Sequence, residues 1–155
     1  MVKMPAIVAE FLGGKRMAVA GVSRDRQHAA NAVFRKLHNS EYEVFPVNPN
    51  ASEVEGVKCY PNLGSIPGSI DGVVVATRPE IAIDVVRQCS DCGIRRVWLH
   101  RSFGGGSVSV AAVRECEVRG IQCIAGGCPL MYREPVDFGH HCMRWWLRWL
   151  GRVPG

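Results

Sequence analysis

Short apolar runs alternate with amphipathic stretches along most of this chain. The apolar runs have the length of strands and lie at 16–22, 43–47, 71–76, 96–99 and 121–124. The amphipathic stretches have helical periodicity and lie at 5–12, 28–39, 79–92, 108–119 and 140–150. Continuously apolar strands between such helices are typical of a parallel sheet that helices cover on both faces. We therefore expect an α/β fold with a Rossmann-like, doubly wound sheet of five parallel strands.

The connections between the strands limit the topology further. Crossovers between parallel strands are right-handed, which leaves few arrangements of five strands. Numbered along the chain, the strands are expected in the order 3-2-1-4-5. The stretch between strands 2 and 3 holds Pro61 and Pro67 and is predicted to be a loop with a short helical turn. Residues 1–132 are expected to form one domain, and residues 133–155 a helical tail packed on it or on a partner subunit.

The composition is that of a globular protein. The chain has 155 residues, of which 47% are hydrophobic and 21% are charged, enough for one domain with a core. No apolar run reaches the length of about 18 residues that a membrane span needs, and the N-terminus does not read as a signal peptide. The seven cysteines are scattered and odd in number, so we expect reduced thiols in a cytoplasmic protein. The net charge of +5 suits an anionic small ligand, nucleic acid or an acidic membrane, of which we expect the small ligand and no nucleic acid.

The ends of the strands supply the candidate ligand site. Ligands of doubly wound sheets bind beyond the carboxyl ends of the strands, where the strand order reverses. The first strand runs into a Gly-Ser turn before a helix, which directs backbone N–H groups and a helix N-terminus at a phosphate. The glycines at 104–106 form either a flexible loop or an anion nest. The candidate residues are Gly21, Val22, Ser23, Arg24, Asn48, Pro49, Thr77, Arg78, Pro79 and Cys128.

Each candidate also has a purely structural interpretation. Gly21 suits a tight turn, Ser23 suits a helix cap, and a single arginine is most often a solvated surface charge. Two arginines, Arg24 and Arg78, follow strands that are expected to flank the same crevice. This coincidence favours a phosphorylated ligand.

A dinucleotide is disfavoured as that ligand. The turn at Gly21 has one glycine where the dinucleotide fingerprint has three. The second strand ends in Asn48 rather than in the acidic residue that holds the ribose of NAD. No arginine lies between 41 and 57 to hold the phosphate of NADP.

An ordered set of short motifs resembles a known family. The longer motifs are Val-Ala-Gly-Val-Ser-Arg-Asp at 19–25, Val-Phe-Pro-Val-Asn-Pro at 44–49 and Glu-Gly-Val-Lys-Cys-Tyr-Pro-Asn-Leu at 55–63, followed by shorter ones at 66–67, 77–80, 97–99 and 127–129. In this order they resemble the small CoA-binding domain proteins, which are related to the N-terminal domain of the succinyl-CoA synthetase alpha subunit. The resemblance spans roughly residues 10 to 132.

The resemblance implies that the first three strand-end loops hold coenzyme A. The turn at 21–24 would take the phosphates, while Asn48-Pro49 and 77–79 would line the adenosine and phosphate groove. Arginine side chains are planar forks that suit phosphate groups. Three positions depart from the family pattern, namely Ala30 for a glycine, Asn50 for a basic residue and His100 for a glutamine. The ligase reaction is not implied, because its second domain has no counterpart in this sequence.

The cysteines and histidines suggest no catalytic or metal site. Cys89 and Cys92 form a C-x-x-C at a predicted helix C-terminus, whereas redox pairs of this kind lie at an N-terminus. Cys128 follows the fifth strand, where it either meets the CoA thiol in a mixed disulfide or fills a small buried space. The spacing of His140, His141 and Cys142 matches no standard zinc pattern.

The tail carries three of the four tryptophans, interleaved with arginines. Trp145 and Trp149 lie about one helical turn apart and share a face. Such a face can pack on its own domain, on a second copy of the chain or on a membrane surface. Packing on protein is expected, because one short basic helix anchors weakly to lipid.

These observations favour a ligand-binding module. We expect the chain to bind CoA or an acyl-CoA without catalysis, as a sensor, a carrier or a thiol-protecting protein, with a homodimer as one arrangement. The alternatives are an NAD(P)-linked oxidoreductase, an acyl-CoA converting enzyme that uses His100 or Cys128, and an interaction protein that uses the tail. The lack of a convincing acid–base pair favours binding alone.

Overall fold

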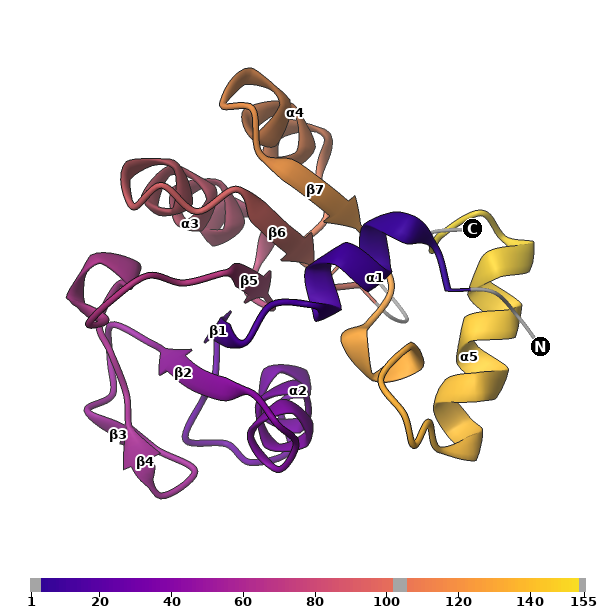
Figure 1. The fold of residues 1–155 in the computed structure, drawn as a ribbon, viewed down its shortest axis with the longest axis horizontal. Helices are drawn as coiled ribbons and strands as arrows, with labels where there is room; N and C mark the ends of the chain where they lie inside the picture. Colours follow the sequence, from indigo (N-terminus) through magenta and orange to yellow (C-terminus); the bar gives the residue numbers. More distant parts are fainter. Residues whose placement is uncertain (1–3, 102–105, 154–155) are drawn as a thin grey trace.

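A central parallel sheet with helices on both faces makes up the protein. The computed structural model describes residues 4–101 and 106–153. The strands of the sheet are β1 (Arg16–Ala20), β2 (Glu43–Val47), β5 (Gly72–Val75), β6 (Arg96–Leu99) and β7 (Gln122–Ala125). The α-helices are α1 (Ala6–Leu12), α2 (Ala29–His38), α3 (Pro79–Asp91), α4 (Val110–Val118) and α5 (Phe138–Trp149) (Figure 1). The predicted α/β class and the five-stranded parallel sheet are confirmed.

The strand order, however, differs from the predicted one. The sheet runs β2-β1-β5-β6-β7, which is 2-1-3-4-5 when its strands are numbered along the chain, so the prediction of 3-2-1-4-5 is wrong. The reason is the face on which the connection 48–71 crosses. α2 packs on one face of the sheet, whereas Leu63 and Ile66 of the connection pack on the other face with α3 and α4. A right-handed crossover on that opposite face carries the chain back past β1, so β5 pairs with the free edge of β1.

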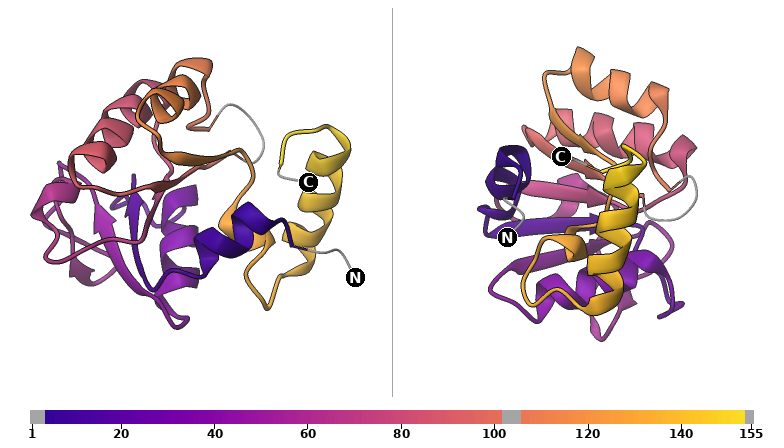
Figure 2. Two further views of the ribbon diagram at one scale, coloured as in Figure 1. Left: turned by 45° about the horizontal axis from the view of Figure 1, so that its top comes forward. Right: turned by 90° about the vertical axis from the view of Figure 1, so that its right-hand side faces the viewer.

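Alternate side chains of the central strands enter two separate cores. Val74 of β5 contacts the cluster that contains residues of α1 and α2, whereas Val73 and Val75 contact the cluster of α3 and α4. Figure 2 shows these helices on the two sides of the sheet. Because each strand is buried on both faces, a continuously apolar sequence is required. This is why the strands were recognisable from sequence.

A small hairpin, which the sequence analysis missed, lies in the connection 48–71. Strands β3 (Glu53–Val54) and β4 (Val57–Lys58) pair antiparallel across a two-residue turn. Both turn residues have a positive φ, 51° at Glu55 and 76° at Gly56, as a type I′ turn requires. The predicted short helical turn is present as the 3₁₀ helix Leu63–Ser65.

The C-terminal helix is attached to the domain through one side. Leu147 is 1% exposed and belongs to the same core cluster as α1 and α2, and Val153 follows it into that cluster. The Nη1 group of Arg144 donates a hydrogen bond of 2.6 Å to the carbonyl of Met131. These contacts hold the helix against the domain.

The tryptophan side chains of the tail are not buried in the contact between α5 and the domain. Trp145 and Trp149 are 71% and 73% exposed, and Trp146 is 47% exposed. Of the two partners expected for these side chains, the chain's own domain does not cover them, because Leu147 occupies the side of α5 that faces it. No helix within 4–101 or 106–153 is both long and apolar enough to cross a membrane.

Candidate functional site

The turn after β1 passes very close to the end of β5. Gly21 has φ +102°, and a Cβ atom there would lie 2.4 Å from the carbonyl oxygen of Ala76. Its N–H donates to the carbonyl of Val47 at the end of β2. Only glycine fits this junction, which joins the carboxyl ends of β1, β2 and β5. The strand order reverses at β1 and β5, so the junction lies where ligands of such sheets bind.

A buried asparagine fixes the backbone of this turn. Asn31 of α2 is fully buried, and its Oδ1 accepts a hydrogen bond of 2.9 Å from the N–H of Ser23. Its Nδ2 donates to the carbonyl of Ser23 at 2.7 Å and to Oε1 of Glu55 at 2.8 Å. The Ser23 hydroxyl accepts from the N–H of Asp25, so the turn is held on both sides. Sequence reasoning missed Asn31, although a polar residue on the apolar side of a helix is a usable signal.

Glu55 supports Asn31 from the tip of the β3–β4 hairpin. Its side chain is 4% exposed and forms ion pairs with Arg35 at 2.7 Å and with Arg26 at 3.4 Å. The hydrogen bond from Asn31 and the two neighbouring guanidinium groups lower the pKa of the Glu55 carboxyl below its ordinary value. The carboxylate thus remains charged and anchors the hairpin to α2. Sequence reasoning missed Glu55 as well. The Glu-Gly pair at 55–56 is the sequence signal of the two-residue turn on which it lies.

One exposed backbone N–H group of the turn, that of Arg24, has no partner within the described residues. The N–H groups of Gly21 and Ser23 already donate hydrogen bonds within the protein, to the carbonyl of Val47 and to Oδ1 of Asn31. In the described part of the chain, the N–H groups of Val22 and Arg24 make no hydrogen bond, but Val22 is fully buried whereas Arg24 is exposed. The exposed guanidinium of Arg24 reaches the carbonyl of Asn50 in the loop after β2. The predicted phosphate turn therefore offers one exposed backbone donor and one cation, both at Arg24.

Asn48 holds the loop after β2 against the turn after β1. Its Nδ2 donates to the carbonyl of Val22 at 2.9 Å, and its Oδ1 accepts from the N–H of Asn50 at 2.8 Å. Pro49 beside it is exposed. Asn48, the residue that disfavours NAD, thus connects the loops after β1 and β2. Of Asn48 and Pro49, Pro49 is the one that a ligand can contact.

A pocket of about 320 Å³ lies at the carboxyl ends of β5 and β6. Its lining residues are His28, Ala29, Ala76, Thr77, Arg78, Pro79, His100, Gly106 and Ser107. The Ser107 hydroxyl donates to the carbonyl of Thr77 at 2.6 Å and so fixes one wall. α3 begins at Pro79, and the N-terminal end of this helix opens on the pocket with Arg78 exposed beside it. The helix dipole and the guanidinium both favour an anionic group here.

His100 lines this pocket as a neutral side chain. It is 6% exposed, and burial lowers its pKa from 6.5 to about 4, with smaller contributions from His28 and His140. A neutral imidazole can donate one hydrogen bond and accept another. His28 caps α2 by accepting from the N–H of Ala30 at 3.3 Å. The pocket thus combines cationic, neutral polar and apolar surface.

The predicted site residues fall into two adjoining groups and one outlier. Thr77, Arg78 and Pro79 line the pocket, whereas the 21–24 turn with Asn48 and Pro49 forms the neighbouring ridge. The close approach of Gly21 to Ala76 joins the two groups. The outlier is Cys128, which lines no part of this pocket.

The structure places Cys128 in the core. It is 3% exposed, and burial raises the pKa of its thiol to about 12. The preceding Gly126 and Gly127 pack against Arg152 and Val153, so the C-terminal segment covers the loop after β7. This environment suits the small buried filler rather than a thiol that exchanges with CoA.

The other reactive side chains gather at no site. Cys89 is buried, and burial raises the pKa of its thiol, whereas Cys92 is exposed. In the stretches that the structure describes, no three His, Cys, Asp or Glu side chains are close enough to hold a metal ion. His140 is instead paired with Asp137, the residue that caps α5.

Comparison with solved structures identifies the same fold elsewhere. A hypothetical protein from Pyrococcus horikoshii superposes with a TM-score of 0.76 at 26% identity, over 88% of this chain and 98% of that one. The dinucleotide-forming acetyl-coenzyme A synthetase 1 from Ca. Korarchaeum cryptofilum, solved with phosphate and ADP, gives a TM-score of 0.63 at 25% identity. That match covers 72% of this chain and 25% of the synthetase.

Sequence comparison identifies the domain. Relatives include ADP-forming acetate–CoA ligase II from Archaeoglobus fulgidus, 34% identical over 83 residues, and the alpha subunit of the Pyrococcus furiosus ligase II, 31% identical over 90 residues. The matches cover 52% and 56% of this chain but only 12% and 19% of those proteins. The family model described as a CoA binding domain matches residues 15–134, from the start of β1 past the end of β7. The chain belongs to this family of CoA-binding domains.

Proposed function

We propose that this chain binds coenzyme A, free or as an acyl-CoA, at the carboxyl ends of β1, β2 and β5. The family match carries the proposal, because it spans every strand-end loop that forms the candidate site. The molecule offers what such a ligand needs, namely a ridge of hydrogen-bond donors beside a pocket. The two are continuous through the contact between Gly21 and Ala76.

The charges of the site support a phosphorylated ligand. The unoccupied N–H group and the guanidinium of the exposed Arg24 suit phosphate oxygens. Across the junction, Arg78 and the N-terminus of α3 supply a second positive region. CoA carries several phosphate charges on one end, so it can engage both regions at once.

The role that we propose is reversible binding, as in a sensor or a carrier of CoA in the cytoplasm. A thiol-protecting role through a mixed disulfide at Cys128 would need the core to open, because that thiol is buried and its pKa is raised to about 12. Protection by enclosure of the CoA thiol needs no such opening. His100 is placed to hydrogen-bond a group of the ligand that enters the pocket.

Calorimetric titration with CoA, acetyl-CoA, NAD and NADP tests the proposal directly. CoA and acetyl-CoA are expected to bind, and both more tightly than either dinucleotide, since Asn48 replaces the acid that a ribose requires. Tighter binding of NAD than of CoA would contradict the assignment.

Replacement of the two arginines tests the place of binding. Arg24→Ala and Arg78→Ala are each expected to weaken CoA binding by about 1–3 kcal/mol, roughly 5- to 150-fold, the range for a charge-assisted hydrogen bond. Arg114→Ala is the matched control, because Arg114 is an exposed arginine of α4 away from the site. Equal affinities in all three variants would place the ligand elsewhere.

A further inference from the structure

The C-terminal helix turns a broad aromatic face away from the domain. Phe138, Trp145 and Trp149 are 84%, 71% and 73% exposed. At about 100° per residue, all three lie about half a turn around the helix axis from Leu147, the side chain that packs into the core. The helix therefore has one side on the domain and an opposite side of large apolar groups. A face of this kind needs a covering environment.

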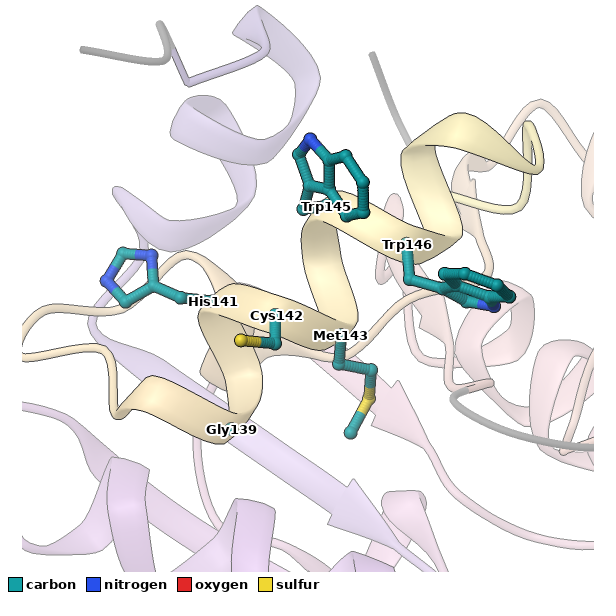
Figure 3. Close-up of a pocket in the computed structure, with 6 residues that line it drawn as sticks. All are labelled: Gly139, His141, Cys142, Met143, Trp145 and Trp146. Atoms are coloured by element: carbon teal, nitrogen blue, oxygen red, sulfur yellow. The ribbon is translucent and has the colours of Figure 1, made fainter.

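A recess in the same helix adds to this face. It has a volume of about 640 Å³ and is lined by Gly139, His141, Cys142, Met143, Trp145 and Trp146. Figure 3 shows Trp145 and Trp146 projecting from α5 in different directions, with Cys142 and Met143 below them. Every lining residue belongs to α5, so the recess is part of the surface of one helix and not a groove between elements.

The charges of this segment are all of one sign. No Asp or Glu follows Asp137 in the sequence, whereas Arg144, Arg148 and Arg152 do. In the described residues these three arginines form no ion pair with a carboxylate. The arginines of the remaining fold that do form such pairs are Arg16, Arg26, Arg35, Arg87, Arg96, Arg119 and Arg133. Arg148 and Trp149 are neighbours on the edge of the aromatic face, where they border a second recess. The environment that covers this face must therefore bring negative charge beside an apolar layer.

A second copy of the chain does not supply that combination. A two-fold contact joins the same surface patch of both copies, so it gathers Arg148 and Arg152 of both chains at one interface with no acid on α5 to compensate. The acid nearest to the helix, Asp137, is already paired with His140. With 12 residues, α5 is about 18 Å long and too short to cross a hydrocarbon layer of about 30 Å.

We propose that α5 is a surface-binding helix that lays its aromatic face on an anionic lipid bilayer. Tryptophan side chains favour the boundary between headgroups and acyl chains, and arginines beside them meet the anionic headgroups. Leu147 and the hydrogen bond from Arg144 to Met131 keep the helix on the domain, so the whole domain is carried to the surface. This inference is independent of CoA binding.

Co-sedimentation of the purified full chain with lipid vesicles tests the proposal. The protein is expected to sediment with vesicles of phosphatidylcholine and phosphatidylglycerol, but not with phosphatidylcholine alone, and to be released at high salt. Tryptophan emission is expected to shift to the blue on binding, because three of the four indoles are exposed beforehand and only Trp98 is buried.

Two variants and their matched controls locate the surface. Trp145→Ala with Trp149→Ala is expected to abolish sedimentation, and Arg148→Glu is expected to lower the partition coefficient about fivefold or more. The controls are Val110→Ala with Val118→Ala, which removes exposed apolar groups of α4, and Arg114→Glu, which reverses an exposed charge there. Melting temperatures of all variants establish that the fold is intact.

Three results would overturn the proposal. The first is absence of binding to both kinds of vesicle. The second is equal binding to neutral and anionic vesicles, since it removes the role of the arginines. The third is a dimer in sedimentation equilibrium that the two tryptophan replacements dissociate, which would make the face a contact between copies.

Discussion

Two buried polar side chains, Asn31 and Glu55, control the shape of the candidate site although neither lines its pocket. Asn31 uses its whole amide on Ser23 and Glu55, and Glu55 uses its carboxylate on Asn31, Arg35 and Arg26. A positive φ at Glu55 costs free energy that these contacts offset. The network joins α2, the hairpin and the turn after β1 into one unit.

Loss of the Asn31 amide is expected to weaken both stability and ligand binding. Asn31→Ala leaves both backbone groups of Ser23 without their side-chain partner and removes one of the three partners of the Glu55 carboxylate, so the free energy of unfolding should fall by about 2–4 kcal/mol. CoA affinity, measured well below the melting temperature, should also fall, because the N–H groups of the turn lose their orientation. Asn39→Ala, at the exposed end of the same helix, is the control and should alter neither. Unchanged affinity in Asn31→Ala would show that the turn keeps its shape unaided.

His100 is expected to make the stability depend on pH. Its pKa is lowered to about 4 in the folded protein, against 6.5 for an ordinary histidine, so the unfolded chain binds more protons between these values. The contribution is fully present above pH 6.5 and is lost as the pH falls toward 4, by about 3 kcal/mol in total. Denaturant titrations from pH 7 to pH 4 should show a shallower loss for His100→Gln. Equal slopes for both proteins would contradict the burial of a neutral imidazole.

At the scale of helices and strands, the apolar periodicity of the sequence predicts where the elements lie but not the order of the strands in the sheet. The apolar runs at β1 and β5 are buried on both faces, and that burial is visible in the sequence. The strand order depends on which face the connection 48–71 crosses, which is decided by where Leu63 and Ile66 pack. No local pattern records that choice.

The site was predictable to a similar degree. The loops that follow β1, β2 and β5 were identified, because the carboxyl ends of parallel strands always meet at one edge. The roles of the individual residues in these loops were not predictable. Ser23 is held by Asn31 of α2, and Asn48 donates a hydrogen bond to the carbonyl of Val22. Cys128 was included for its place after β7, but the tail covers that loop. Contacts between distant elements decide all three cases.

The junction of β1 with β5 requires a glycine for a reason that a paired experiment can isolate. Gly21→Ala and Gly56→Ala both place a side chain at a positive φ, 102° and 76°. Only at Gly21 does the added Cβ meet a backbone atom, the carbonyl oxygen of Ala76 at 2.4 Å, while Gly56 has open space. Gly21→Ala should therefore lower the free energy of unfolding by about 1–3 kcal/mol more than Gly56→Ala. Equal losses would mean that the junction yields without cost.

At the scale of the whole molecule, the chain combines a domain rich in internal ion pairs with a basic aromatic segment. The family match ends at residue 134, and α5 begins at Phe138, just beyond it. Yet α5 is not an independent unit, because Leu147 and Val153 complete a core cluster that begins at Val8. The candidate site and the aromatic face are thus parts of one packed body.

Replacements on opposite sides of α5 distinguish its buried contact with the domain from its exposed aromatic face. Leu147→Ala removes a side chain that is 1% exposed in the core and should lower the free energy of unfolding by about 2–5 kcal/mol. Trp145→Ala removes one that is 71% exposed and should alter it by no more than about 0.5 kcal/mol.

Denaturant unfolding of both variants, followed by far-ultraviolet circular dichroism and by tryptophan fluorescence, measures these effects. The two probes should give one coincident transition, since helix and domain share a core. An early fluorescence transition, with Leu147→Ala as stable as the parent chain, would instead make α5 a separately unfolding segment. A large loss in Trp145→Ala that grows with protein concentration would place that indole against a second copy, because only association makes the stability of an exposed site depend on concentration.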